Sequence, residues 1–484
     1  SAASDVYKRQ AKNPIFVIAQ VYLNGVSAGE AYLSEVGSQV YAVGTNGYDI
    51  TENVKSRLAA RGDQMITNQD IPVPTWFVNY DAADHSLQYW KTANDCSPSG
   101  TQNADYGTVY VQAGDSDAWQ TQYAGPISKV AVDSRQSLSG REIHDFLTCY
   151  TRYDNTSAYG NALMLRGDYT DVIVNAHKSP DRYAEQKVTM PDGATATMIC
   201  TIVDIEGEPR EILFYIPENA SELQPDGAPV ITVWAGGSQT NIIFFDSTCW
   251  WETANQNGIA LIFTNEAYNT SVAVTPADVD ACYHAMLDLL EGWNDSGKFQ
   301  FDLSRIYSTG QSMGSMESQQ FAQETPDYYA AVASTSFYQD YPDAHSDKPI
   351  PTYLINGEGN GKDDTGTPYD DRWNRTDDWA QYFLRVNGFV YTPAVYAADG
   401  TVTTFGVPVS EPVFTVTGPY DRFETYTWIN GQDIPLVQYT NSLYRPHNCL
   451  TSEIPMLWDF LEHYRCERDE DGAVTARYYS ASAF

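Results

Sequence analysis

Residues 301–324, FDLSRIYSTGQSMGSMESQQFAQE, hold the pattern that most constrains how this chain can fold. Strand-forming residues at 305–309 lead into a turn, Gly310–Gly314, and good helix formers follow as far as Pro326. A strand, the turn G-x-S-x-G and a helix, in this order, form a nucleophile elbow. Glycine suits both outer positions of the turn because a Cβ atom there would clash with the adjoining strand or helix. The pattern therefore predicts a strained turn that lifts the Ser312 hydroxyl out of a sheet.

The context of this motif matters more than the motif itself. With glycine and serine each near ~7% of residues, about one chain in six of this length should carry G-x-S-x-G by chance. A plain glycine-serine turn is therefore the ordinary alternative. The strand before the turn and the helix after it are what a nucleophilic serine requires, and they favour Ser312 in that role.

Composition limits the class of protein. The chain has 484 residues, of which 42% are hydrophobic, and this suggests two or three domains with a substantial core. Its formal net charge of −35 argues against a nucleic-acid partner, because the phosphates would be repelled. No apolar run reaches the length of about 18 residues that a membrane-spanning helix needs. The acidic composition is consistent with an extracellular or a salt-tolerant setting, and we expect secretion.

The cysteines give no metal-binding pattern. The seven cysteines include no C-x-x-C pair and no zinc-type spacing with histidine, so the sequence argues against metal–thiolate chemistry. Their odd number leaves at least one outside any disulfide. Cys249–Cys282 and Cys449–Cys466 are the candidate pairs.

The first part of the chain has a different sequence pattern from the rest. Residues 1–13 include DVYKRQ, which resembles the translation of a transposon end familiar in metagenome-derived sequences, so we expect an assembly scar or a disordered segment. Residues 14–182 alternate short strand candidates with turn pairs and predict a β-rich accessory region. Within it, 171–175 has the composition of a strand, and Ser139–Glu142 is a capping box that opens a helix.

From residue 183 onward apolar strands alternate with amphipathic helices. Residues 229–234, 259–264 and 351–356 have the composition of buried strands. This alternation predicts an α/β catalytic domain over 183–484, with a doubly wound, mostly parallel sheet and helices on both faces. Residues 389–429 are strand-like and resemble an insertion. In such a sheet, reactive groups gather in the loops at the carboxyl ends of the strands.

A serine nucleophile needs a base and a carboxylate that orients the base. In this fold they follow the serine in the order acid, then histidine. His345 precedes the expected acid, and His463 lies inside the last helix. His447 lies between the last strand of the sheet and the last helix, where the base belongs, and we predict it in that role.

The acid should follow the strand at 351–356. Glu358, Asp363 and Asp364 all fit on spacing, and we favour Asp363 or Asp364. A solvated acidic loop or a calcium-binding loop is the ordinary alternative for these carboxylates. An oxyanion hole needs two preorganised N–H groups. We predict them at Met313, which follows the nucleophile, and at Gly237 in the upstream glycine loop.

These motifs resemble those of the polyhydroxybutyrate depolymerase-type esterases of the α/β-hydrolase superfamily, a group that includes feruloyl and acetylxylan esterases. The resemblance covers roughly half of the chain at most. It is carried by WAGGSQT at 234–240, FDLSRIY at 301–307, the turn at 310–314 and Pro446–Asn448 before the last helix.

The resemblance implies Ser312 as nucleophile, His447 as base, and Gly237 with Met313 as oxyanion donors. Two positions depart from the family pattern. Ala235 stands where the family usually has a histidine before the oxyanion glycine. Asn360 stands where an aspartate is expected after the acid strand, so the acid must come from elsewhere or be missing.

Residues and resemblance together predict a secreted serine carboxylic-ester hydrolase that acts through an acyl-enzyme and needs no cofactor. The expected substrates are feruloyl or acetyl esters of plant polysaccharide, or a polyester. The aromatic content of 13% slightly favours sugar-linked aromatic esters. The alternative is a degenerate hydrolase that serves as a carbohydrate-binding or scaffold protein, a reading supported by Asn360.

Overall fold

The fold was analysed in a computed structural model of the whole chain. The residues described are 10–12, 14, 17–24, 28–39, 67–80, 85–113, 129–153, 162–165, 171–205, 207–237, 240–264, 276–338, 345–357, 376–392, 395–396, 402–404, 413–417, 421–443, 449–470 and 472–484. The chain forms two compact units, the first essentially residues 1–169 and the second residues 170–416 and 421–484.

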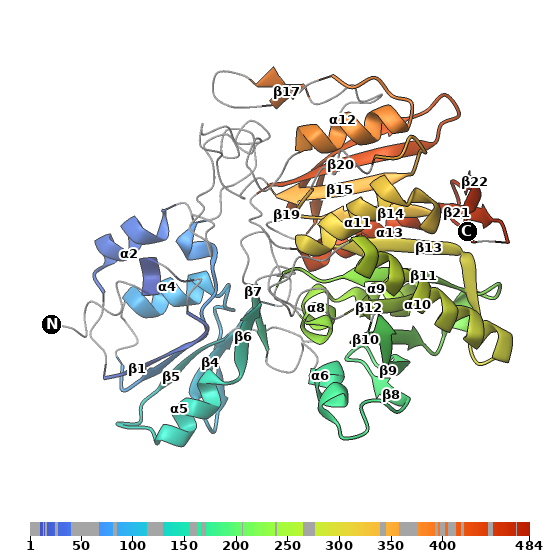
Figure 1. The fold of residues 1–484 in the computed structure, drawn as a ribbon. Helices are drawn as coiled ribbons and strands as arrows, with labels where there is room; N and C mark the ends of the chain where they lie inside the picture. The colour runs from blue at the N-terminus through green and yellow to red at the C-terminus, as the bar shows by residue number, and fades with distance from the viewer. Residues whose placement is uncertain are drawn as a thin grey trace. The chain divides into compact units, whose positions relative to one another are not determined.

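The first unit is built on a five-stranded sheet in the order β1-β2-β5-β4-β3 (Figure 1). The pairs β1–β2 and β2–β5 are parallel, and the pairs β5–β4 and β4–β3 are antiparallel. Its elements are β1 (Gln20–Leu23), α2 (Glu30–Gly37), η2 (Asn68–Asp70), β2 (Thr75–Val78), α4 (His85–Ala93), β3 (Thr101–Asn103), β4 (Gly107–Val111), β5 (Lys129–Asp133), α5 (Gly140–Leu147) and the separate pair β6 (Tyr150–Tyr153) and β7 (Ala162–Leu165).

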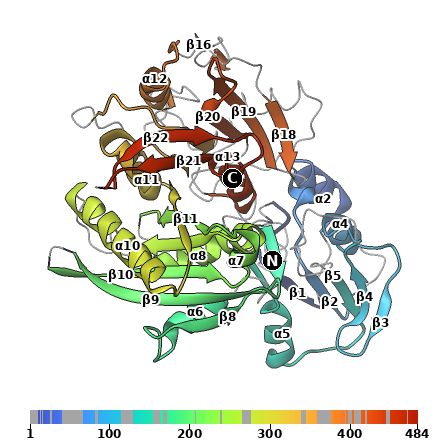
Figure 2. The same ribbon diagram turned by 90° about the vertical axis from the view of Figure 1, so that its right-hand side faces the viewer.

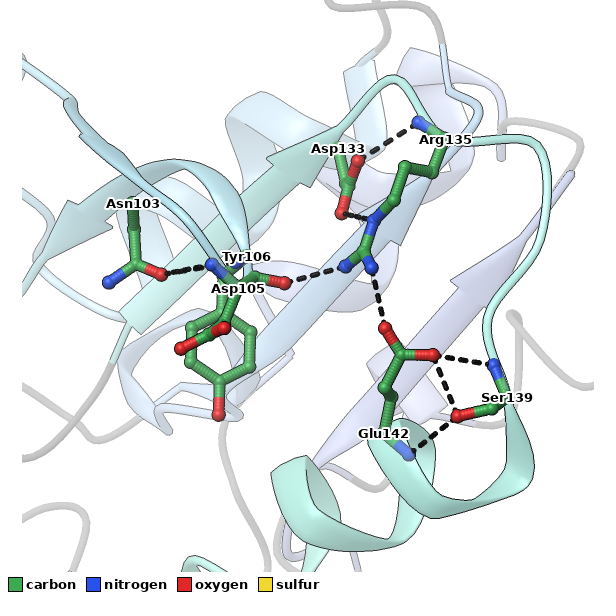
Figure 3. Close-up of polar contacts among 7 residues, drawn as sticks. All are labelled: Asn103, Asp105, Tyr106, Asp133, Arg135, Ser139 and Glu142. Carbon is green, nitrogen blue, oxygen red and sulfur yellow. Dashed lines mark hydrogen bonds and ion pairs between the residues drawn. The ribbon is translucent and has the colours of Figure 1, made fainter.

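The start of α5 is held by a polar cluster centred on Arg135 (Figure 3). Its guanidinium donates to Asp133 Oδ2 at 2.6 Å, to Glu142 Oε1 at 2.5 Å and to the Asp105 carbonyl at 2.6 Å. Glu142 Oε2 also accepts from the N–H and the hydroxyl of Ser139, while the Ser139 Oγ accepts from the Glu142 N–H. The capping box expected from the sequence is therefore confirmed.

The second unit is built on an 11-stranded sheet in the order β18-β19-β20-β15-β14-β13-β11-β12-β10-β9-β8. The strands are β8 (Gln186–Thr189), β9 (Thr195–Ile205), β10 (Glu208–Pro217), β11 (Ala228–Trp234), β12 (Ala260–Thr264), β13 (Phe301–Gly310), β14 (Ala331–Thr335), β15 (Thr352–Gly357), β18 (Val413–Thr417), β19 (Asp421–Ile429) and β20 (Pro435–Leu443). From β12 to β20 the neighbours pair in parallel. Antiparallel strands extend both sides.

Helices cover both faces of this sheet. Phe214 of β10 packs on Trp293 of α10, and the next residue, Tyr215, packs on Phe245 of α8. Successive strand residues point to opposite faces, so α10 and α8 lie on opposite sides. The helices are α10 (Pro276–Ser296), α11 (Met313–Glu324) and α12 (Thr376–Val386) on one face, and α8 (Asn241–Thr248), α9 (Trp250–Asn257) and α13 (Ile454–Leu461) on the other. This arrangement confirms the predicted doubly wound α/β fold.

Smaller elements complete the second unit. The pair β21–β22 follows α13 near the C-terminus (Figure 2). The remaining elements are α6 (Asp171–Lys178), α7 (Ala220–Leu223), η5 (Pro326–Tyr328), β16 (Val395–Tyr396), β17 (Val402–Thr404), η7 (Thr451–Glu453), β21 (Tyr464–Arg468) and β22 (Val474–Tyr479). Within the described part of the chain, no helix combines the length and apolar character needed to cross a membrane.

Two local predictions need correction. Residues 171–175, expected as a strand, begin the helix α6. Their run of valine and isoleucine is too short for its period to distinguish a strand from a helix. Residues 10–12, inside the segment expected to carry no fold information, are helical, and Ala11 packs in the core of the first unit.

The predicted disulfide pairs are also wrong, because none of the seven cysteines forms a disulfide. Cys249 precedes α9 and Cys282 lies in α10, so the sheet separates them. Cys449 lies two residues before η7, whereas the Sγ of Cys466 donates to the Ser304 carbonyl near the start of β13.

Candidate active site

Ser312 lies in the turn between β13 and α11 with φ 58° and ψ −115°. A non-glycine residue rarely adopts a positive φ, and it does so where the surrounding structure imposes it. The turn is held on both sides. The Gln311 N–H donates to the Trp234 carbonyl of β11 at 3.4 Å, and the Ser312 N–H donates to the Thr335 carbonyl of β14 at 3.2 Å. The strained turn expected from the sequence is present.

Both glycines of the motif are required by close packing of backbone. A Cβ atom on Gly310 would lie 2.3 Å from the carbonyl oxygen of Gly314. A Cβ atom on Gly314 would lie 2.0 Å from the carbonyl oxygen of Trp234. Since backbone atoms on a sheet cannot move aside as a side chain can, neither position accepts alanine without displacing the turn.

The helix α11 behind the turn contacts the sheet partly through small polar side chains. Ser315 Oγ donates to Ser334 Oγ at 3.0 Å, and Ser318 Oγ accepts from Ser308 Oγ at 3.0 Å. These four serines are fully buried. A buried hydroxyl that makes such hydrogen bonds avoids the desolvation cost of an unsatisfied one. The serines therefore fix how α11 lies on β13 and β14.

The two predicted oxyanion donors are neighbours beside this turn. Met313 is the first residue of α11, where backbone N–H groups have no acceptor within the helix. Gly237 follows β11, and a Cβ atom on it would lie 2.7 Å from Met313 Sδ. The glycine loop thus lies against the residue that follows Ser312. The helix N-terminus favours negative charge at the same place.

The other predicted site residues, His447, Asp363 and Asp364, lie outside the described residues, as do Glu358 and Asn360. The strands that precede them are described. β15 ends at Gly357 and β20 at Leu443, and the two strands pair in parallel with Gly357 opposite Ser442. Because β13, β14, β15 and β20 are parallel neighbours, these strands end at the same edge of the sheet as the Ser312 turn.

A buried glutamate that the sequence did not single out lies close to the turn. Glu453, at the end of η7, is fully buried, and its Oε2 accepts from Thr335 Oγ1 at 2.9 Å and from the Leu450 N–H at 3.3 Å. Thr335 is also the residue whose carbonyl accepts from Ser312. Glu453 therefore connects the segment that follows His447 to β14, the strand that supports the Ser312 turn.

A second buried carboxyl group lies in a row of polar residues across three strands. Asn356 of β15, Asn441 of β20 and Glu424 of β19 are opposite one another in register, and each is at most 4% exposed. Tyr439 donates its hydroxyl to Asn441 Oδ1 at 2.7 Å. Burial raises the pKa of Glu424 to about 7, and a hydrogen bond with Asn441 partly opposes this shift.

Comparison with known proteins finds similarity among solved structures but not among family profiles or curated sequences. No known family profile matches the sequence, and no curated protein sequence matches it. Among solved structures, an acetyl xylan esterase from Aspergillus awamori is 14% identical with a TM-score of 0.35, over 54% of this chain and 98% of that one. A ferulic acid esterase is 12% identical with a TM-score of 0.27, over 34% of this chain and 79% of that one.

A third similar structure is the S-formylglutathione hydrolase FrmB from Staphylococcus aureus, 18% identical with a TM-score of 0.25, over 33% of this chain and 79% of that one. These similarities are weak. The doubly wound sheet and the strand, G-x-S-x-G turn and helix at its carboxyl edge are features of this chain itself. The fold is that of an α/β-hydrolase.

Proposed function

We propose that this protein is a serine carboxylic-ester hydrolase with Ser312 as its nucleophile. The observation that carries the proposal is the backbone of Ser312. A non-glycine residue at φ 58° stands between the carboxyl end of β13 and the N-terminus of α11, and backbone contacts on both sides hold it there. Strain of this kind costs about 1–3 kcal/mol, persists only where the surrounding structure imposes it, and is concentrated at active sites.

In the proposed reaction, Ser312 Oγ attacks the ester carbonyl carbon and His447 takes the hydroxyl proton. The negative charge that develops on the carbonyl oxygen is accepted by the N–H groups of Met313 and Gly237. His447 then gives its proton to the leaving alcohol. Water, activated by the same histidine, releases the acid from the acyl-Ser312 intermediate.

We propose Asp363 or Asp364 as the acid that orients His447, and Glu358 is the third candidate. Glu453 has a different proposed role. Its bonds to Thr335 and Leu450 make it a positioning residue that holds the chain after His447 against the nucleophile strand. Substituting each of the three loop carboxylates by alanine in turn identifies the acid by the loss of turnover.

For the substrate we propose feruloyl or acetyl esters of plant polysaccharide, or a polyester, in a secreted protein. Support comes from the sequence motifs shared with that esterase group, from the net charge of −35 and from the aromatic content of 13%. The second candidate function is a degenerate hydrolase that binds carbohydrate. Its support is Asn360, an amide where an orienting carboxylate is expected.

The two candidates are separated by a fluorophosphonate probe and a panel of esters: p-nitrophenyl acyl chains, methyl ferulate, acetylated xylan and polyester film. We expect one adduct on Ser312 and a fall in turnover of at least about 10³-fold in Ser312→Ala. Ser296→Ala, at an exposed serine that ends α10, is the matched control and should keep full turnover. Folded protein that forms no adduct would overturn the enzyme proposal and leave the binding function.

A further inference from the structure

Three side chains of the kinds that bind metal ions meet beside the β9–β10 hairpin of the second unit. They are His177 of α6, Cys200 of β9 and Glu211 of β10, and one ligand atom from each lies within 4.8 Å of the others. His177 Nε2 and Glu211 Oε1 are 2.7 Å apart. The helix α6 lies beside β8 and these two long strands in Figure 1 and in Figure 2.

The surroundings of Cys200 make it unsuited to act as a free nucleophile. The residue is 1% exposed, so its thiol is closed off from a substrate. A reactive cysteine needs a lowered pKa and access to a substrate. A catalytic Cys-His-Glu set is therefore disfavoured. The side chains of His177 and Glu211 are 15% and 11% exposed, which leaves a short path from solvent to the cluster.

The Glu211 carboxylate of the cluster is oriented by a hydrogen bond from a buried amide. Asn241, the first residue of α8, is fully buried and donates its side-chain N–H to Glu211 Oε1 at 3.2 Å. The Oδ1 of Asn241 accepts from the Ile242 N–H at 2.7 Å, so the amide has a fixed orientation. Hydrogen bonds of this kind to a ligand carboxylate are a regular part of protein metal sites.

We propose that His177, Cys200 and Glu211 bind a zinc ion. Imidazole nitrogen, thiolate sulfur and carboxylate oxygen are the three ligand types that Zn²⁺ takes, at about 2.0–2.3 Å. A thiolate and a carboxylate together balance the charge of the ion, and the histidine binds as a neutral ring. The thiolate selects zinc over magnesium or calcium, which require oxygen ligands. Water completes the four-coordinate site.

The position of the cluster in the sheet gives the ion a structural role. Glu211 stands one residue before Ile212, which lies opposite Thr264 at the carboxyl end of β12. The ion would fasten α6 to β9 and β10 at this edge. Through Asn241 it would also steady the start of α8, which follows the loop that carries Gly237. The site is separate from Ser312, so either proposal can fail without the other.

The test is metal content together with cobalt spectroscopy on the full chain. We expect about one zinc per chain after purification without chelator. Replacement by Co²⁺ should give a thiolate-to-cobalt charge-transfer band, and both the band and the zinc should be lost in Cys200→Ser. Cys282→Ser, at a buried cysteine of α10, and Ser312→Ala should retain both.

Glu211→Gln provides a second variant that preserves the size of the side chain. It should weaken zinc binding about 10-fold or more while the protein stays folded by circular dichroism. Removing zinc with a chelator should lower the melting temperature of the wild type, and adding zinc should restore it. Wild-type protein that holds no zinc and shows no charge-transfer band with Co²⁺ would overturn the proposal. So would equal zinc content in the wild type and Cys200→Ser.

Discussion

Two glutamates, Glu142 of the first unit and Glu424 of the second, have opposite surroundings. Glu142 lies at the surface, and hydrogen bonds from Ser139, together with the Arg135 guanidinium, lower its pKa to about 2. Glu424 is 3% exposed, and burial raises its pKa to about 7 although Asn441 hydrogen-bonds to it. In the Arg135 cluster each charged group lies beside a group of opposite charge, whereas Glu424 is buried beside the neutral amide of Asn441.

The comparison indicates where substitution should be costly. A polar group at the surface can exchange its partner for water, so its loss costs little. A buried polar group cannot, and removing its partner leaves a desolvated donor or acceptor. We therefore expect larger effects in the second unit, around Ser312, Glu424 and Glu453, than around Arg135. The following predictions test this difference in order of decreasing effect.

The largest effect on stability is expected for Gly314→Ala. The added methyl group would lie 2.0 Å from the Trp234 carbonyl oxygen, so the turn or β11 must shift, and we expect a loss of more than about 3 kcal/mol. Urea unfolding of the second unit measures it. Gly292→Ala is the matched control, because a Cβ atom there in α10 meets nothing within 4 Å. It should stabilise by up to about 1 kcal/mol. Similar unfolding midpoints for the two variants would contradict the packing described for the turn.

The second-largest effect on stability, which depends on pH, is expected for Glu424→Gln. The folded-state pKa of about 7 is above the unfolded value, so the native state holds the proton more tightly and stability falls as pH rises from about 4.5 to 7. Glutamine does not titrate, so the variant should not lose stability in this pH range through residue 424. The variant should gain up to about 3 kcal/mol at pH 8 and nothing below pH of about 4.5.

The control for this prediction is Glu142→Gln, whose pH dependence has the opposite sign. The pKa of Glu142 is lowered to about 2, so its contribution is present above the unfolded value and is lost as pH falls from there through about 2. Glu142→Gln should therefore destabilise at pH 8, and the effect should vanish in acid. Unfolding curves measured at several pH values compare the two variants. If the effect of both substitutions on stability changed with pH in the same direction, the contrast between the two glutamates would be contradicted.

Glu453→Ala should have a smaller effect on stability together with an effect on turnover. Thr335 Oγ1 and the Leu450 N–H would lose their acceptor in a buried place, at a cost of about 1–3 kcal/mol. If Glu453 positions the segment after His447, kcat should fall about 10-fold or more with KM nearly unchanged, and Glu453→Gln should restore part of the loss. Glu467→Ala, at an exposed glutamate of β21, should change neither. Unchanged kcat in Glu453→Ala would remove the positioning role.

The smallest effect is expected for Ser139→Ala in the first unit. The substitution removes the hydroxyl that accepts from the Glu142 N–H at the start of α5, at a cost of about 1 kcal/mol. Ser139→Asp, which keeps a capping acceptor, should lose less. Thermal unfolding measures both, and ester turnover should be unchanged in both. A loss as large as that in Gly314→Ala would contradict the distinction between the two units.

Much of the fold followed from local patterns. The apolar strands and amphipathic helices predicted the doubly wound sheet, the motif at 310–314 predicted the strained turn, and Ser139–Glu142 predicted the cap of α5. Each depends on residues adjacent in sequence, whose spacing fixes the local geometry. The errors arose where spacing alone is ambiguous. The valine-rich start of α6 fits a strand as well as a helix, and the cysteine pairs require knowing which face of the sheet each residue occupies.

The conformation of the Ser312 turn could be predicted from the sequence alone, because two glycines flank the serine between a strand and a helix and few backbone conformations fit that arrangement. Only the tertiary structure brought Glu453 to Thr335 and aligned Glu424 with Asn441 and Asn356. It also brought His177, Cys200 and Glu211 together from a helix and two strands, at a spacing that no metal motif describes. Such contacts depend on the order and register of the strands, which bring together residues far apart in the sequence.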